Sequence, residues 1–330
     1  MKWLECVPNF SEGRNPQVIQ ALADAISSVK GVVLLHVDSG YDANRTVYTF
    51  AGEPYKVVQA AYKAILKASE CIDMRLHQGE HPRMGACDVC PFVPLGELNM
   101  KEAVEYSLQL GKQLGEAGIP VYLYEQSCRQ PERRNLAYLR KGEYESIPEK
   151  LKYQEWLPDF GPTEMNERFG MMALGARNFL IAYNINLDSD DVGIAKKIAS
   201  VVRESGHTNA KGEKVAGMLP SVKAIGWWME SYQCAQVSTN ITDFTVTSVK
   251  KVFDTVRDVA DGFGIGVKGS ELIGLIPERA LLDASEELSI PREEKSVKIC
   301  NAIRYLGLDI NPEERVLEWV IQKKSDDETF

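Results

Sequence analysis

The order of strand and helix patterns in the second half of the chain constrains its fold most strongly. Short apolar or alternating runs predict strands, and apolar residues three or four positions apart predict amphipathic helices. The predicted elements are strands over 178–187, 222–229, 234–241 and within 264–275, and helices whose apolar faces begin at Val192 and Val249. We place the N-cap of the first of these helices at Asp188 or Ser189. The order β-α-β-β-α-β predicts an α+β fold of the ferredoxin-like, split βαβ type, with helices on one face of an antiparallel sheet.

The first half of the chain shows a looser version of the same order. Its strand patterns cover 4–7, 32–37, 45–50 and 121–124, Asn15 with Pro16 and then Pro54 open two helices, and Asn99 with Glu102 forms a capping box for a third. Residues 141–177 are rich in glycine, proline and aromatic residues, and we interpret them as a long loop that forms a pocket wall. We predict two subdomains, 1–177 and 178–330.

Composition limits the classes of ligand and compartment. A formal net charge of -9 disfavours broad binding to nucleic-acid backbones, which requires a basic face. Residues 1–15 lack the apolar core of a signal peptide, and no apolar run is long enough to span a membrane. The seven cysteines, an odd number, suit reduced thiols better than a disulfide framework. We expect a cytoplasmic protein that binds neither nucleic acid nor a membrane.

Residues 77–92 hold two of the four histidines and two of the seven cysteines. Histidine can accept and give a proton near pH 7, so this segment is a candidate for acid–base chemistry. Its start matches the H-x-x-E-H zinc pattern, but Gly79 and Pro82 disfavour the helix on which such ligands must lie. Cys87 and Cys90 have C-x-x-C spacing without a second such pair, which favours buried thiols. Composition alone favours a catalytic pair no more than two loop histidines that are hydrogen-bonded to the backbone.

Seven blocks of the sequence together resemble one enzyme family. The blocks are Cys6–Gly13, Asn44–Phe50, His77–Gly85, Asp159–Pro162, Gly175–Arg177, Ala235–Asn240 and Gly269–Pro277. They are similar, in this order and over nearly the whole chain, to glutamate formimidoyltransferase, the formiminotransferase part of formiminotransferase-cyclodeaminase. The resemblance implies two ferredoxin-like subdomains with a cleft between them, paired as a homodimer. It also implies a transferase of histidine degradation and one-carbon metabolism, which moves the formimidoyl group from N-formimidoyl-L-glutamate to N5 of tetrahydrofolate.

The same resemblance implies the catalytic residues. N5 of tetrahydrofolate attacks the amidine carbon and loses a proton, the departing glutamate nitrogen gains one, and a single histidine can carry out both transfers. His81 stands at the family's catalytic position, and Asp38 is the carboxylate expected to orient it. Asp38 could instead form an Asx turn before Gly40. We expect His77 to support the site, tetrahydrofolate to be a cosubstrate, and no metal to be needed.

Both substrates carry carboxylates, so cationic anchors are expected. The candidates are Arg45, Arg83 and Arg177, although each could instead form a structural ion pair. The folate-contacting segment of the family falls on residues 162–171, which include Pro162, Gly170 and Met171.

Other activities remain open at this stage. Related folate enzymes that use formimidoylglycine or 5-formyltetrahydrofolate are alternatives, and a zinc hydrolase of the H-x-x-E-H type is a more distant one. Since no cyclodeaminase segment follows in this sequence, we expect a separate cyclodeaminase to act on the product.

Overall fold

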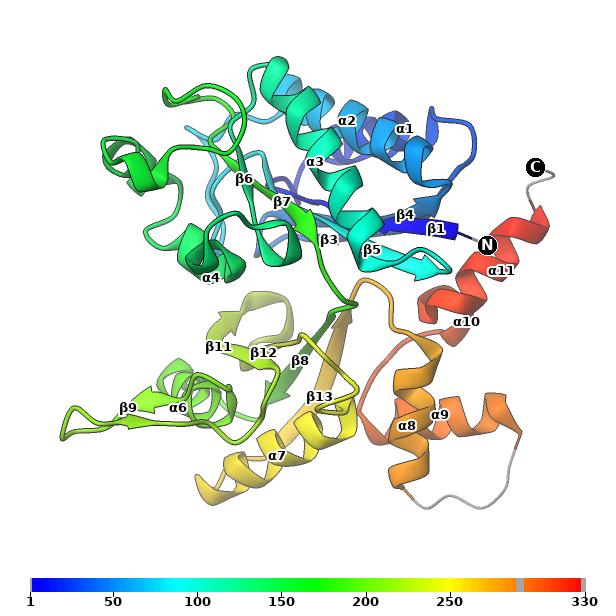
Figure 1. Cartoon of the computed structure of the whole chain (residues 1–330). Coiled ribbons are helices and arrows are strands. Elements are labelled where there is room, and N and C mark those ends of the chain that lie inside the picture. Colours follow the sequence, from blue (N-terminus) through cyan, green and yellow to red (C-terminus); the bar gives the residue numbers. More distant parts are fainter. Residues whose placement is uncertain (1, 289–293, 328–330) are drawn as a thin grey trace. The chain divides into compact units, whose positions relative to one another are not determined.

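The computed structural model describes residues 2–288 and 294–327. The chain divides into two compact units, of which one ends at Asn178 and the other begins at Phe179, and each unit is described by itself (Figure 1). Both combine helices with a largely antiparallel sheet, so the fold is of the α+β class, as predicted. Among the helices of the described residues, none has both the length and the apolar character needed to cross a membrane.

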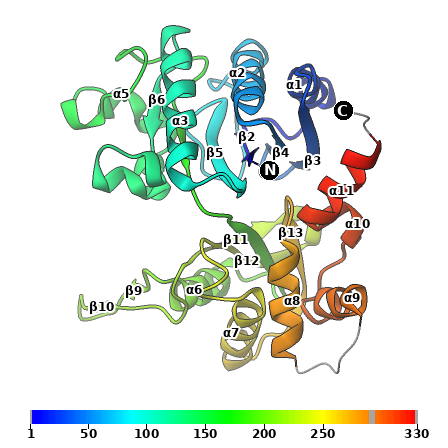
Figure 2. The same cartoon turned by 45° about the vertical axis from the view of Figure 1, so that its right-hand side comes forward.

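The second unit is built on a four-stranded antiparallel sheet with the order β11-β12-β8-β13. Its main elements are β8 (Ile181–Leu187), α6 (Val192–Val202), β11 (Val222–Met229), β12 (Cys234–Ile241), α7 (Val249–Gly262) and β13 (Val267–Ile273). Both helices pack their apolar stripes on one face of the sheet, where they lie beside it in Figure 2. A Cβ atom at Gly226 of β11 would collide with the backbone of Ala195, so this glycine lets α6 approach the sheet closely.

Several parts of the second unit differ from the prediction or add to it. The N-cap of α6 is Asp191 rather than Asp188 or Ser189, because its carboxylate accepts the N–H groups of Gly193 (2.7 Å) and Ile194 (3.2 Å). The additional elements are β9 (His207–Thr208), β10 (Lys214–Val215), α8 (Glu278–Glu287), α9 (Lys295–Tyr305), α10 (Pro312–Arg315) and α11 (Leu317–Asp327).

The first unit repeats this strand order and then extends it. Its first elements are β1 (Lys2–Cys6), β2 (Asn9–Phe10), α1 (Pro16–Ser27), β3 (Val32–Gly40), β4 (Arg45–Gly52), α2 (Pro54–Cys71) and β5 (Cys87–Gly96). Antiparallel pairing places β3, β4, β1 and β5 side by side in that order. The chain continues through α3 (Met100–Glu116), whose capping box is present, to β6 (Val121–Leu123) and β7 (Met172–Ala176). β7 lies parallel to both β5 and β6 and completes a seven-stranded sheet.

Three strands of the first unit, the two-residue β2 and the longer β5 and β7, lie in segments for which we predict none. β5 occupies the end of the motif segment, and its residues from Cys87 to Val93 are all buried, so it lacks the alternation that reveals a half-exposed strand. β7 has the sequence MALGA, whose small residues favour no strand, and it lies at the end of the segment interpreted as a loop. The first split βαβ motif is therefore closed by β5, and the strand over residues 121–123 belongs to the extension.

Short helices fill the connection between β6 and β7. They are η1 (Glu125–Ser127), η2 (Pro131–Arg134), α4 (Leu136–Arg140), η3 (Tyr144–Ser146), α5 (Ile147–Lys150) and η4 (Gln154–Trp156). Leu139 and Ile147 pack with Tyr122, Tyr124 and Ala173 in a small core of their own. This core lies against the face of β6 and β7 opposite α3, while the main core lies under α1, α2 and α3.

Candidate active site

The sheet of the first unit has two chemically different faces. The helices α1, α2 and α3 cover one face, where Tyr48 of β4 is fully buried. Side chains alternate along a strand, so Arg45 and Val47 point to the other face. Val47 pairs directly with Asp38 of β3 and with Asn9 of β2, and directly paired side chains share a face. We call this second face the site face.

A β-bulge in β5 turns Asp88 toward the site face. The register between β2 and β5 passes from the pair Asn9–Val89 to the pair Phe10–Cys87, so Asp88 is an extra residue on β5. An extra residue interrupts the alternation of side chains and can redirect one of them. The side chain of Asp88 is completely buried, and its partners come from the site face.

Asp88 is paired with two guanidinium groups. Its Oδ2 lies 2.8 Å from Nη1 of Arg45 and accepts a hydrogen bond from Nη2 of Arg140, while its Oδ1 accepts the Met84 N–H at 2.9 Å. Burial raises the pKa of Asp88, but the positive charges of Arg140 and Arg45 outweigh this and hold that pKa well below its ordinary value. The carboxyl group is therefore ionised at neutral pH, and the Arg45–Asp88–Arg140 cluster carries one positive charge in excess.

His81 lies within the electric field of this cluster. Its Nδ1 is 2.8 Å from the carbonyl oxygen of Pro82, and because a carbonyl can only accept, Nδ1 carries the hydrogen. Burial lowers the pKa of His81 well below its ordinary value, and the charges of Arg45 and Arg140 lower it further. At pH 7 the ring is therefore neutral, with the lone pair on Nε2, which is the form that can accept a proton.

Asn44 joins three segments around the histidines. Its backbone is in the left-handed region (φ 45°), and its side chain is buried. Its Oδ1 accepts the Gly13 N–H at 3.0 Å, and its Nδ2 donates to the carbonyl oxygen of Gln78 at 2.9 Å. Its own carbonyl oxygen lies 2.8 Å from Nε2 of His77. Three of the blocks that resemble the transferase family therefore meet at one residue.

Both ring nitrogens of His77 have protein partners. Nε2–H donates to the Asn44 carbonyl, and Nδ1 accepts from Nε of Arg83 at 3.3 Å. Burial lowers the pKa of His77, the bond to Asn44 raises it, and the charge of Arg83 lowers it again, so that the net pKa lies below its ordinary value. His77 is thus a neutral ring with a fixed tautomer that fastens the loop to its neighbours.

Arg83 is already engaged by two carboxylates. Its Nη1 and Nη2 lie 2.8 and 2.6 Å from the two oxygens of Glu145, and Nη1 also lies 3.1 Å from Glu143. One cation shared by two anions leaves this group with a negative charge in excess. In this respect Arg83 is the opposite of Arg45, although the sequence makes both of them candidates for substrate anchors.

The other predicted catalytic and anchor residues belong to the same unit. The carboxylate of Asp38 lies on the site face, 3.7 Å from Nε2 of His36. Arg177 follows β7 and donates from Nη1 to the carbonyl of Asn178 at 2.9 Å. That Asp38 orients His81 and that Arg177 holds a substrate stay predictions.

The predicted folate segment ends beside the histidine segment. Gly170 has a positive φ of 77° and forms a β-bridge with Gly85, and the N–H of Met171 donates to the Met84 carbonyl at 3.2 Å. Pro162 lies at the other end of the segment, next to the bridge between residues 160 and 121. Gly170 and Met171 are therefore brought to His77–Gly85, and Pro162 is placed near β6.

The histidine segment is not helical. It lies between the end of α2 at Cys71 and the start of β5 at Cys87, and residues 77–84 form bends and irregular structure. An H-x-x-E-H zinc site needs its histidines one helical turn apart on the same face. Because His77 also uses both ring nitrogens within the protein, the zinc-hydrolase alternative has no geometric support.

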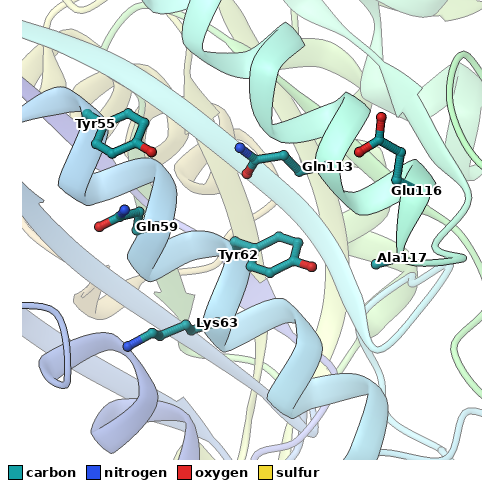
Figure 3. Close-up of a pocket in the computed structure, with 7 residues that line it drawn as sticks. All are labelled: Tyr55, Gln59, Tyr62, Lys63, Gln113, Glu116 and Ala117. Atoms are coloured by element: carbon teal, nitrogen blue, oxygen red, sulfur yellow. The ribbon is translucent and has the colours of Figure 1, made fainter.

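A cavity of about 700 Å³ lies elsewhere in the first unit, between α2 and α3. Its lining includes Tyr55, Gln59 and Tyr62 of α2 with Gln113 and Glu116 of α3, as Figure 3 shows. These helices cover the face of the sheet opposite the site face. The cavity is therefore separate from the histidine segment, and no predicted site residue lines it.

Sequence reasoning missed Asp88 and Arg140. The signal for Asp88 was present, because a carboxylate inside the apolar run from Cys87 to Val93 must find a charged partner when the run is buried. Arg140 carries no comparable signal. It lies in a short helix far along the chain from its partner, and only the packing of residues 131–165 brings the two together.

Comparisons with known proteins agree with the resemblance. Residues 3–177 match the model of the formiminotransferase domain, N-terminal subdomain, and residues 182–322 match the model of the formiminotransferase domain. A formimidoyltransferase-cyclodeaminase from Gallus gallus is 47% identical over 99% of this chain, which spans 61% of that relative's length. Glutamate formimidoyltransferases from Streptococcus pyogenes serotype M1 and Thermoplasma acidophilum are 45% and 42% identical, and this chain covers 92% of each.

Solved structures give no further help. A microcompartment protein from Desulfitobacterium hafniense DCB aligns with 83% of this chain at 11% identity and a TM-score of 0.21, too low to carry an argument. The two family models together account for nearly the whole chain, and they divide it between residues 177 and 182, close to the division between its compact units. The chain belongs to the formiminotransferase domain family.

Proposed function

We propose that this chain transfers the formimidoyl group from N-formimidoyl-L-glutamate to N5 of tetrahydrofolate, giving 5-formimidoyltetrahydrofolate and L-glutamate. The observation that carries the proposal is the similarity, over 92% of their length, to two glutamate formimidoyltransferases. The arrangement around His81 supports it, because the reaction needs a neutral imidazole near a binding site for anions.

His81 acts first as a base and then as an acid. As N5 attacks the amidine carbon, Nε2 of His81 accepts the proton that N5 loses, and the imidazolium then gives a proton to the glutamate nitrogen as its bond to carbon breaks. The hydrogen bond from Nδ1 to the Pro82 carbonyl supports this role, since it leaves the lone pair on Nε2. The low pKa of His81 keeps the ring neutral until the proton arrives and makes its return to the leaving nitrogen favourable.

The neighbouring residues have supporting parts in this proposal. Asp38 stabilises the positive charge that His81 carries between the two transfers, a part that its place on the site face favours. His77 holds the loop through Asn44 and does not exchange protons, because both of its nitrogens are engaged. Arg45 binds a donor carboxylate, whereas the two carboxylates on Arg83 assign it to loop structure.

Tetrahydrofolate binds along residues 162–171 in this proposal. The β-bridge between Gly170 and Gly85 brings the end of that segment to the histidine segment. Met171 anchors this end of the segment in the small core, and Pro162 lies at the other end. Arg177 follows β7 with no carboxylate on its guanidinium among the described residues, so it can take a carboxylate of the folate tail.

The finer features are proposals as well. Each unit is ferredoxin-like, which the repeated strand order supports. The enzyme is a cytoplasmic homodimer that needs no metal, because His81 can move both protons. A cyclodeaminase then acts on the product.

The test is transfer by the purified chain in excess chelator. N-formimidoyl-L-glutamate and tetrahydrofolate are mixed with the protein, and acid converts the product to the absorbing methenyl form. We expect product in the presence of chelator. No product from this donor, together with product from formimidoylglycine or 5-formyltetrahydrofolate, would overturn the assignment of the donor, and activity that disappears with chelator would overturn the metal-free mechanism.

A further inference from the structure

We propose that Arg45 and Arg140, held side by side by Asp88, form the binding site for the α-carboxylate of the formimidoyl donor. This inference rests on the proposed function and deepens it by naming a substrate subsite and two residues, Arg140 and Asp88, that complete it. Arg45 and Arg140 contact the substrate in this account, while Asp88 is a positioning residue.

The cluster has a surplus of hydrogen-bond donors. Arg45 donates from Nε to Asn9 at 3.1 Å and pairs through Nη1 with Asp88, and Arg140 donates from Nη2 to the same carboxylate oxygen. Within residues 2–288 and 294–327, Arg45 and Arg140 donate no other hydrogen bond, and neither the buried Nη1 of Arg45 nor the buried Nε of Arg140 meets an acceptor in hydrogen-bonding geometry. Two guanidinium groups therefore share one carboxylate, and most of their N–H donors have no protein partner.

Buried guanidinium groups with unpaired donors are energetically unfavourable. Arg45 is only 7% exposed, and a buried cation with incomplete hydrogen bonding is unfavourable unless a further anion completes it. A carboxylate suits the position, because a guanidinium presents its N–H groups in a plane that matches two carboxylate oxygens. Arg83 differs from Arg45 and Arg140 in this respect, since two carboxylates of the protein already neutralise its charge.

The position of the cluster indicates which of the two donor carboxylates it binds. The cluster lies beside the histidine segment, because Asp88 accepts the N–H of Met84, three residues after His81, and its charges also lower the pKa of the His81 ring. His81 must reach the nitrogen that leaves the amidine carbon. In the donor, the α-carboxylate is attached to the carbon that bears this nitrogen, whereas the γ-carboxylate lies at the far end of a flexible side chain. A cationic cluster beside His81 therefore fits the α-carboxylate.

The test compares two donors that differ at that carboxylate. N-formimidoyl-L-glutamate carries both carboxylates, and 4-(formimidoylamino)butanoate keeps only the one at the far end. We expect the wild type to prefer the first donor in kcat/KM by about 10- to 100-fold, the size of a charge-assisted hydrogen bond. Arg140→Met should reduce kcat/KM for formimidoylglutamate by a similar factor and leave that for the butanoate nearly unchanged.

The matched control is Arg279→Met on α8, which removes a surface arginine paired with Asp283 and should leave both donors unaffected. An Arg140→Met variant in which kcat/KM falls equally for both donors would overturn the proposed subsite. If Arg140→Met does not fold, the wild type still decides, because equal kcat/KM for the two donors contradicts any anchor for the α-carboxylate. No transfer from formimidoylglutamate by the wild type would instead overturn the proposed function, and the subsite with it.

Discussion

The sheets of the two units have the same strand order. They differ in how completely the polar groups on the face away from the long helices are hydrogen-bonded. In the second unit this face carries Gln236, which is fully buried and uses its whole amide group: its oxygen accepts from Trp227, and its nitrogen donates to Asn186 and Glu271. Asn184 donates to the same oxygen of Glu271. In the first unit the corresponding face carries the Arg45–Asp88–Arg140 cluster, in which donors outnumber acceptors.

This difference distinguishes polar groups that stabilise a sheet from polar groups whose unpaired donors can bind a ligand. A buried network whose donors and acceptors are all paired stabilises the fold, and removing one member leaves the others unpaired. A buried cluster with unpaired donors costs stability, and such a cost is typical of binding sites. The balance of donors and acceptors therefore points to the first unit as the place of chemistry.

The largest expected effect comes from His81. In the proposed mechanism His81 moves both protons, and His81→Asn removes that group, so kcat should fall by about 100- to 10,000-fold, while folding and folate binding persist. Rapid-quench measurement of 5-formimidoyltetrahydrofolate gives the rate. His207→Asn, on β9 of the second unit, is the matched control and should keep the wild-type rate. An H81N variant with more than a tenth of that rate would contradict the assignment.

A stability measurement tests the second unit. Gln236→Leu keeps the bulk of the side chain but leaves the Trp227 N–H and the Asn186 oxygen unpaired, so the free energy of unfolding should fall by about 1–3 kcal/mol. Urea denaturation measures it. Ser238→Ala on the same strand, where no side-chain hydrogen bond exists within the described residues, should change little. A Q236L variant of full stability that lost folate binding would reverse the comparison.

The pH dependence of kcat/KM tests the electrostatics of the first unit. In the proposed mechanism the base form of His81 is the active one, and the pKa of this ring is low, so wild-type activity should persist below pH 6.5 and fall only at more acidic pH. Arg140→Met removes a charge that lowers this pKa, so its acid limb should move to higher pH. Asp88→Asn removes a charge that raises it, so its limb should move to lower pH. Shifts in the same direction for both variants would disprove the arrangement.

The smallest expected effect concerns stability at acidic pH. The pKa of His77 is lower in the folded chain than in the unfolded one, mainly through burial. Its contribution to stability is therefore complete above pH 6.5 and is lost as the pH falls from 6.5 toward the folded-state pKa. His77→Gln keeps a donor for Asn44 and an acceptor for Arg83 without titrating. Its denaturation midpoint should change less than that of the wild type between pH 7.5 and 5, and equal changes would refute this contribution.

Local patterns predicted the strands of the four-stranded sheet in the second unit better than the strands of the first unit. The ends of β11 and β12 follow from alternating residues between a buried and a polar face, and the predicted and observed boundaries agree. β5 and β7 were not predicted, because burial on both faces removes the alternation of apolar and polar residues. No local pattern then distinguishes them from loop or motif segments. The parts of a fold that are buried most completely can thus be the hardest to recognise from periodicity.

The candidate site divides in the same way. His77 and His81 stand out because histidine is rare in this chain, and the glycines beside them mark a loop. Their surroundings depend on contacts that no local pattern encodes: the bulge that turns Asp88, the packing that brings Arg140 to it, and the carboxylates that occupy Arg83. The sequence therefore predicts Arg45 and Arg83 equally as anchors for substrate carboxylates, and only the partners of each side chain in the structure distinguish them.

The protonation state of His81 tests the central claim most directly. With four histidines in the chain, ¹⁵N spectra of the imidazole rings can be assigned by single variants, H81N among them. At pH 7 the account predicts that His81 is neutral, with its hydrogen on Nδ1 and an unprotonated Nε2 that becomes protonated only well below pH 6.5. A ring protonated on both nitrogens at pH 7, or a neutral ring with its hydrogen on Nε2, would contradict it.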